Sequence, residues 1–264
     1  MTFAVVSPVS ALVGRDLRAF LRSRSQLSSS LLFPLMLLAI LGTGIERGLN
    51  PTLIRDGDYL SFLVPGVVVM TAVFSSTFSS ASYYQDRDDG MLRVLLATPN
   101  PPWVIMLGKS LAGVIIGSLQ ALAVVAVAAL LPAVHLSWQY GVGAGLAASV
   151  AGIALLNVLL SGFALALASR IRTMSGFHLV MNLGLFPALF FSGAFYPLAR
   201  LPAWLETLGW LNPLSFGVDL LHVAMYADTT AGYFGLGVDI AVLTTLSVAV
   251  YAWGLSRHAR EGER

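Results

Sequence analysis

The sequence predicts an all-α protein that crosses a lipid bilayer several times. Only 11% of the 264 residues are charged and 57% are apolar, whereas a soluble domain usually carries about a quarter charged residues. The charges are also clustered, and the gaps between them have the length of about 20 residues that a spanning helix needs. Because the chain contains no cysteine, disulfides and cysteine-ligated metal centres are excluded. We interpret residues 1–264 as a single membrane domain.

Five uncharged stretches predict six spanning helices. Two stretches near the start, 25–45 and 59–85, hold one span each. The 60-residue stretch 110–169 is interrupted near its middle by Pro132 and several glycines, so it is interpreted as a hairpin of two spans. Two further stretches follow toward the C-terminus. The predicted spans are approximately 27–46, 60–82, 104–131, 142–168, 175–195 and 236–256.

Residues 10–24, before the first span, have the pattern of an amphipathic helix. Arg15, Arg18 and Arg22 interleave with apolar residues at nearly helical spacing, which suits a helix lying in the headgroup plane. The alternative is a solvated tail that only influences topology.

The distribution of basic residues predicts the orientation of the chain, because basic loops stay in the cytoplasm. With both termini inside, twelve Lys and Arg residues lie on the cytoplasmic side. Only Arg47, Arg55 and Arg200 lie outside. We therefore expect both termini in the cytoplasm. The ratio of 14 Arg to one Lys indicates a high-GC bacterial source, hence a bacterial cytoplasmic membrane.

The connection between the second and third spans, residues 83–99, predicts a short cytoplasmic helix. A charged cluster passes into an apolar helix face that prolines then stop. Its charges could pair with a partner protein while its leucines fill a cleft; a hydrated surface loop remains the alternative. The residues singled out are Asp86, Arg87, Asp88, Asp89, Gly90, Leu92, Arg93, Leu95 and Leu96.

The outer connection, within residues 196–227, is too long for a turn and too apolar for a hydrated loop. Prolines divide it into two candidate helices, 202–211 and 214–226, that are too short to cross a bilayer. We interpret it as a re-entrant hairpin that shapes a pathway or gate, with tryptophans as interfacial anchors; a cap on the outer surface is the alternative. The residues singled out are Pro197, Trp204, Trp210, Asn212, Pro213 and Asp219.

Asp219 and Asp239 both lie near the outer face in this scheme. Either could line a polar path or sit in contact with water at the interface. The interfacial interpretation is favoured for Asp239, and both remain open for Asp219.

No catalytic constellation is recognisable. The histidines are scattered, and Gly108-Lys109-Ser110 lacks the earlier glycine and the preceding strand of a phosphate-binding loop. Asp88-Asp89-Gly90 lacks the further aspartates of membrane phosphotransferases. We therefore expect no catalytic residue, metal or cofactor in this chain, and no nucleic-acid partner.

Two runs of the sequence resemble the ABC-2 family of ATP-binding-cassette exporter permeases, in particular its daunorubicin-resistance-like branch. The first is the run 86–99, which is similar to the family's Glu-Arg-Glu-x-Gly-Thr-Leu-x-x-Leu-x-x-Thr-Pro pattern. The second comprises 191–197 with its Ser-Gly and Pro residues, then Leu-Pro at 201–202 and Asn-Pro-Leu at 212–214. Aspartates stand where glutamate is commoner, and Met91 replaces the usual threonine.

The resemblance implies that 86–97 is a coupling helix that docks on a separate cytoplasmic ABC ATPase, and that the N-terminal helix helps to hold this ATPase. It implies two permease chains, identical or paralogous, with two ATPase chains that bind ATP and Mg²⁺. The function implied is outward transport of an amphiphilic drug, antibiotic or lipid within the membrane. A secondary transporter or channel without an ATPase is the alternative, and a membrane-embedded phosphotransferase is less favoured.

Overall fold

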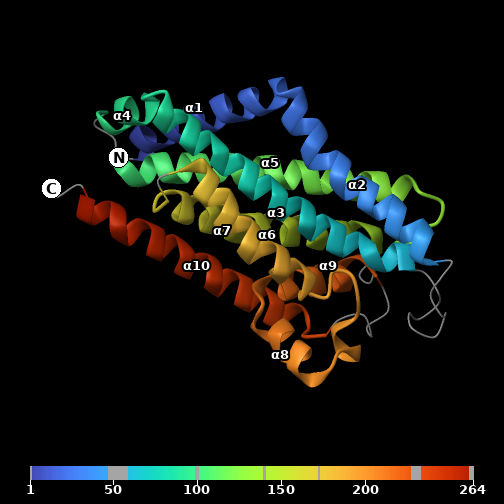
Figure 1. Ribbon diagram of the computed structural model, residues 1–264. Coiled ribbons are helices and arrows are strands. Elements are labelled where there is room, and N and C mark those ends of the chain that lie inside the picture. The colour runs from blue at the N-terminus through green and yellow to red at the C-terminus, as the bar shows by residue number, and fades with distance from the viewer. Residues whose placement is uncertain are drawn as a thin grey trace.

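The computed structural model describes residues 2–46, 59–98, 101–138, 141–171, 173–226 and 233–261. Within these ranges every regular element is a helix (Figure 1), which confirms the all-α prediction. The elements are α1 Thr2–Arg22, α2 Arg24–Glu46, α3 Tyr59–Asp88, α4 Met91–Leu96, α5 Pro102–Leu130, α6 Gly141–Ala168, α7 Met174–Phe190, the short 3-10 turn η3 Leu198–Arg200, α8 Ala203–Leu211, α9 Pro213–Met225 and α10 Leu236–Glu261.

Each predicted span corresponds to a helix, namely α2, α3, α5, α6, α7 or α10, although the predicted fifth span, 175–195, extends five residues beyond the end of α7 at Phe190. In the described part of the chain, four helices, α3, α5, α6 and α10, are each long and apolar enough to cross a membrane. The bent pair α1 and α2 would make a fifth span. Helix α7 has 17 residues, or about 25 Å at 1.5 Å per residue, which is short of the roughly 30 Å hydrocarbon core. Four to five candidate spans are therefore established, and six remains a prediction.

Helix α3 forms the centre of the bundle and packs against α2, α5, α6, α7 and α9 (Figure 1). Its middle section is apolar, and residues such as Leu63, Val64 and Val67 are fully buried. Gly66 allows the closest approach, because a Cβ at this position would overlap the backbone of Ala194. Any displacement of α3 must therefore disturb most of the bundle.

Helix α1 does not continue the direction of α2. The two helices meet at a bend of 84°, so α1 lies across the end of the bundle, near α4 (Figure 1). There it packs along α5, where Leu12 lies so close to Gly108 that an added Cβ would come within 3.0 Å of it. If α2 crosses a membrane, this bend places α1 nearly parallel to the membrane surface.

The predicted break in the outer connection is confirmed at Asn212. Helix α8 ends at Leu211 and α9 begins at Pro213. The Asn212 side chain accepts a hydrogen bond from the backbone N–H of Leu214 at 3.1 Å, so it acts as the N-cap of α9. Its Nδ2 donates to the carbonyl oxygen of Ala188 in α7 at 2.5 Å. Beyond Pro213 every residue of α9 is buried, and α9 packs mainly against α6 and α10.

Candidate functional site

The candidate site lies where α3 ends and α4 begins. Helix α3 continues to Asp88, so the charged run that was expected on the short helix lies mostly on the last turn of the long one. Gly90 then adopts a left-handed conformation, with φ of 73°, which glycine reaches without steric cost. The predicted segment 86–97 is therefore divided between two helices that meet at Gly90.

The end of α3 and helix α4 together present charged and apolar side chains outward. Asp88 on α3, Asp89 in the turn and Arg93 on α4 are exposed. Met91 and Val94 of α4 are exposed too, with 39% and 60% of their surface accessible.

Of the leucines predicted to contact a partner, Leu92 and Leu95 of α4 are half-buried. The side chain of Leu96 lies outside the described residues. Sequence reasoning missed Val94. The signal was its position three residues after Met91, which places both on one face of a helix.

The C-terminal end of α3 is tied to the end of α6. Tyr84 is buried, and its hydroxyl donates to the carbonyl oxygens of Ala168 and Ile171 at 3.3 and 3.2 Å. Arg87 is exposed, and its Nη1 lies 3.5 Å from the carbonyl oxygen of Ile171. Arg87 is thus partly engaged within the chain.

Asp86 points inward, into a group of four charged side chains that we call the Arg15–Lys109 cluster. The members are Arg15 and Asp16 on α1, Asp86 on α3 and Lys109 on α5. Arg15 Nη2 and Lys109 Nζ each lie 2.6 Å from the same oxygen of Asp86. Asp16 is 2.8 Å from Arg15 and 3.4 Å from Lys109. The cluster therefore fastens three helices together directly before α4, and Asp86 is occupied within the chain.

Most of this cluster is shielded from solvent. The exposed fraction of the side chain is 3% for Lys109, 8% for Asp16 and 14% for Asp86, whereas it is 34% for Arg15. Ser82 adds two hydrogen bonds, since its hydroxyl accepts from Lys109 Nζ at 3.2 Å and donates to Asp16 at 3.4 Å. Buried charges are tolerated when paired and hydrogen-bonded in this way.

Sequence reasoning did not identify Asp16 or Lys109 as parts of a site. A signal was present, because Lys109 is the one lysine of the chain and stands inside an otherwise apolar helix. A charged residue in a helix without other charges requires a partner.

A small polar cavity adjoins Lys109. It has a volume of about 10 Å³, roughly the space of one water molecule. The lining residues come from α3, α5 and α6 and are mostly hydroxyl-bearing: Ser76, Ser80, Tyr83, Lys109, Ser110, Ser161 and Leu165.

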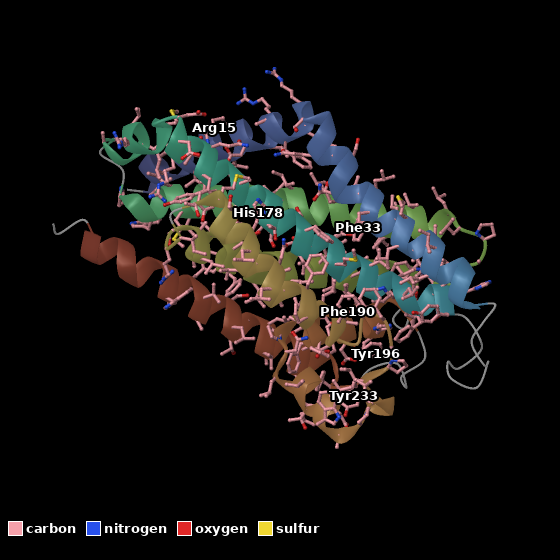
Figure 2. All side chains as sticks on the ribbon, in the orientation of Figure 1. Arg15, Phe33, His178, Phe190, Tyr196 and Tyr233 are labelled. Carbon is pink, nitrogen blue, oxygen red and sulfur yellow. The ribbon has the colours of Figure 1, made fainter. Side chains whose placement is uncertain are left out.

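The other two arginines predicted on the N-terminal helix, Arg18 and Arg22, are exposed. Arg18 Nε donates to the carbonyl oxygen of Gly14 in its own helix at 2.8 Å. Helix α1 thus carries Arg15 on the side that faces the bundle and Arg18 and Arg22 away from it. Figure 2 shows Arg15 near α4 and Tyr233 at the opposite end of the bundle.

At that opposite end, Trp204 and Trp210 are 65% and 55% exposed, and Pro197 precedes the turn η3. Trp210 Nε1 donates to the hydroxyl of Tyr233 at 3.2 Å. That hydroxyl donates in turn to the carboxylate of Glu206, which raises the pKa of Tyr233 above its usual range. This hydrogen-bonded chain connects α8 to the segment before α10.

Asp219 is only 4% exposed and holds the segment directly before α10. Its carboxylate accepts hydrogen bonds from the backbone N–H groups of Tyr233, Phe234 and Gly235, at 2.6, 2.9 and 3.3 Å. Asp219 therefore joins α9 to α10 by hydrogen bonds to the backbone. Asp239, which was expected at the water interface, is instead completely buried. In the described ranges, no three His, Asp or Glu side chains gather in a way that could hold a metal ion.

Comparison with known proteins connects this geometry to a family. Residues 8–226 match the family model of the ABC-2 type transporter. Over 213 residues the chain is 29% identical to the probable multidrug ABC transporter permease YbhR of Escherichia coli K12, covering 79% of this chain and 55% of YbhR. The chain thus spans about half the length of that relative.

Two further relatives are covered over most of their length. The inner membrane transport permease YadH of Escherichia coli K12 is 28% identical over 203 residues, which are 74% of this chain and 73% of YadH. Nodulation protein J of Bradyrhizobium diazoefficiens is 26% identical over 215 residues, 81% of this chain and 76% of that protein. Because the family model covers nearly all helices from α1 to α9, the chain belongs to the ABC-2 type transporter family.

Proposed function

We propose that this chain is the membrane subunit of an ATP-driven exporter that moves an amphiphilic drug, antibiotic or lipid outward, powered by a separate cytoplasmic ABC ATPase. Membership of the ABC-2 family makes it an integral membrane permease of an ABC transporter. The observation that carries the finer proposal is the exposed surface formed by the end of α3 and by α4, where exposed charges lie beside exposed Met91 and Val94. Such a face suits docking into a groove of another protein.

The Arg15–Lys109 cluster gives α4 a mechanical connection to the bundle. Asp86 lies five residues before α4 and is held by Arg15 of α1 and Lys109 of α5. A pull on α4 by the ATPase therefore moves α1, α3 and α5 together. Because α3 packs against most other helices, this movement re-packs the membrane domain. ATP and Mg²⁺ bind to the ATPase in this proposal.

The assembly we propose contains two ATPase chains and two permease chains, identical or paralogous, surrounded by membrane lipid. Helices α2, α3, α5, α6, α7 and α10 form six spans, with α7 as the short fifth. Both termini are cytoplasmic, in keeping with the position of α4 and of the end of α10 at one end of the bundle (Figure 1).

Helices α8 and α9 form the re-entrant hairpin of this proposal and shape the exit. Irregular backbone at membrane depth must be covered by protein or line a cavity. The complete burial of α9 beyond Pro213 supports this requirement. Exposed Trp204 and Trp210 suit anchoring at the membrane surface.

Charge reversal directly before α4 tests the proposal. The tagged wild-type chain is purified and its associated ABC ATPase is identified by mass spectrometry. We expect Asp88→Lys with Asp89→Lys to reduce recovery of this ATPase at least tenfold and to abolish transport, because the charges meet their partner across a complementary interface. Thr207→Lys, an exposed position on α8, is the matched control and should leave recovery unchanged.

Intact recovery and transport in the double variant would show that α4 is not the docking element. A secondary transporter is the second candidate, since it would use buried acids such as Asp219 and Asp239. Transport by the purified chain in vesicles without any ATPase would favour it and overturn the exporter.

A further inference from the structure

Asp239 is a buried acid whose oxygens lack a donor. It lies in the first turns of α10, its residue is 0% exposed, and neither carboxylate oxygen has a hydrogen-bond partner. More than nine-tenths of buried polar groups are hydrogen-bonded, and an unpaired buried charge is strongly unfavourable. A group that neutralises Asp239 is therefore required.

The ionisable group that faces Asp239 is Asp219 of α9. Asp219 accepts three backbone N–H bonds from residues 233–235. These bonds engage both carboxylate oxygens, since Oδ1 accepts from Tyr233 and Oδ2 accepts from Phe234 and Gly235. A carboxylate can accept a further hydrogen bond but cannot donate one. A second negative charge on Asp239 would face it directly.

The other elements packed against this place supply no hydrogen-bond donor to Asp239 among their described residues. His222 of α9 is buried, but its Nδ1 lies 3.0 Å from the carbonyl oxygen of Val218 and its Nε2 lies 3.1 Å from that of Phe62. Both ring nitrogens are thus directed at backbone carbonyls, so neither bonds to Asp239. Helix α6, which packs on α9 and α10, contains no charged residue, and Glu206 of α8 is bonded to Tyr233.

We propose that Asp239 binds one proton and donates it as a hydrogen bond to the carboxylate of Asp219, so that the pair closes α9 onto α10. Two carboxyl groups that share a site hold a proton in this way because like charges cannot both ionise at short range. The proton comes from the aqueous phase, and its release leaves two adjacent negative charges.

In this arrangement, binding and release of the proton control how firmly α9 is held against α10. With the proton bound, α9 is held by the Asp239–Asp219 hydrogen bond and by the bonds from Asp219 to the backbone of residues 233–235. Without it, the two carboxylates repel each other and α9 is held less firmly. The inference concerns this chain alone, and does not depend on an ATPase partner.

Thermal and chemical unfolding of the purified chain in detergent tests this site between about pH 6 and about pH 10, a range in which ordinary carboxyl groups do not titrate. If the folded chain keeps a proton that the unfolded chain releases, stability falls as pH rises. The expected slope is about a tenfold fall in the folded-to-unfolded ratio per pH unit while the folded chain holds the proton, and it flattens once the folded chain also releases it.

Asp239→Asn mimics the protonated acid, because its amide can donate to Asp219. We expect this variant to match the wild-type stability at neutral pH and to lose the slope. Asp239→Leu lacks a donor and should be destabilised at every pH. Glu206→Gln, which changes a nearby acid outside the pair, should keep the wild-type slope. Infrared spectroscopy should show a protonated carboxyl band in the wild type that is missing in Asp239→Asn.

Several outcomes would overturn the proton site. A flat pH dependence in the wild type contradicts it, and so does an Asp239→Asn variant as unstable as Asp239→Leu. If sodium chloride stabilises the wild type relative to choline chloride, and Asp239→Asn abolishes the difference, the site holds a metal cation instead. A failure of ATPase co-purification leaves these measurements unaffected, so the two proposals are tested separately.

Discussion

Buried carboxyl groups at the two ends of the bundle have different partners. At the end formed by α1, α3 and α5, the carboxylate of Asp86 receives two cations at 2.6 Å each. At the end formed by α9 and α10, Asp219 is satisfied by backbone N–H groups, and Asp239 has no hydrogen-bond donor. One end is neutralised by opposite charges and the other requires a ligand from outside.

This difference assigns different mechanical roles to the two ends. The cations of the Arg15–Lys109 cluster belong to the chain itself and pair directly with Asp86, so the cluster is a permanent connection. It suits the transmission of force from α4 into α3. The α9–α10 contact depends on a bound proton in our proposal, so it suits an element that opens and closes. The variants below can break or sharpen this contrast.

Loss of Lys109 should have the largest effect. Lys109→Met removes the most deeply buried cation of the cluster and leaves two carboxylates short of a partner. Removing one member of a buried ion pair usually costs about 3–5 kcal/mol. We expect a loss of this size in the free energy of unfolding, measured by chemical denaturation of the purified chain.

A second substitution checks that the loss is electrostatic. Asp86→Asn removes the carboxylate that Lys109 contacts at 2.6 Å, so the double variant Lys109→Met with Asp86→Asn should be more stable than Lys109→Met alone. If Lys109→Met and the double variant are equally stable, Lys109 acts through packing, and the ion pairs of the cluster do not stabilise the fold.

Substitution of Gly90 should have the next largest effect and should act on coupling as well as stability. Gly90 has φ of 73°, a region that costs an ordinary L-residue about 1–2 kcal/mol. Because no atom lies within 4 Å of a Cβ added here, Gly90→Ala introduces backbone strain without a clash.

Asparagine tolerates the left-handed region better than alanine does. The matched variant Gly90→Asn should therefore retain more stability than Gly90→Ala and more ATPase recovery in the co-purification assay. If both variants behave alike, the left-handed turn does not set the position of α4.

At the other end, Asn212→Ala should cost about 0.5–2 kcal/mol, the usual range for loss of an N-cap. The cap on Leu214 and the bond to Ala188 are both lost. Asn212→Asp keeps the capping oxygen but loses the Nδ2 donor, and should give an intermediate free energy of unfolding. Equal losses in the two variants would assign the whole effect to the contact with α7.

The helices could be predicted from the sequence to a large extent, whereas the charge cluster could not. Uncharged stretches and prolines mark the helices, since both reflect local physical requirements. The end of α3 was misplaced because charged residues do not end a helix. Gly90, with its left-handed backbone, does.

The Arg15–Lys109 cluster depends on tertiary structure. Arg15 and Asp86 are 71 residues apart, and Asp16 and Lys109 are 93 residues apart. Only the bend of 84° between α1 and α2 and the packing of α1 on α5 bring them together. The sequence shows an isolated lysine, and the structure supplies its partners.

Arg15→Ala should have the smallest effect, and it separates the outer from the inner half of the cluster. The Arg15 side chain is 34% exposed whereas that of Lys109 is 3% exposed, so solvent and salt weaken its attraction to Asp86. We expect a loss of less than about 1 kcal/mol at moderate ionic strength, in the range of partly exposed ion pairs. This loss should shrink as salt is added, whereas that of Lys109→Met should persist because its site is buried. A loss for Arg15→Ala that equals that of Lys109→Met and does not respond to salt would mean that α1 is held mainly by Arg15, and that the buried lysine is not the principal fastening.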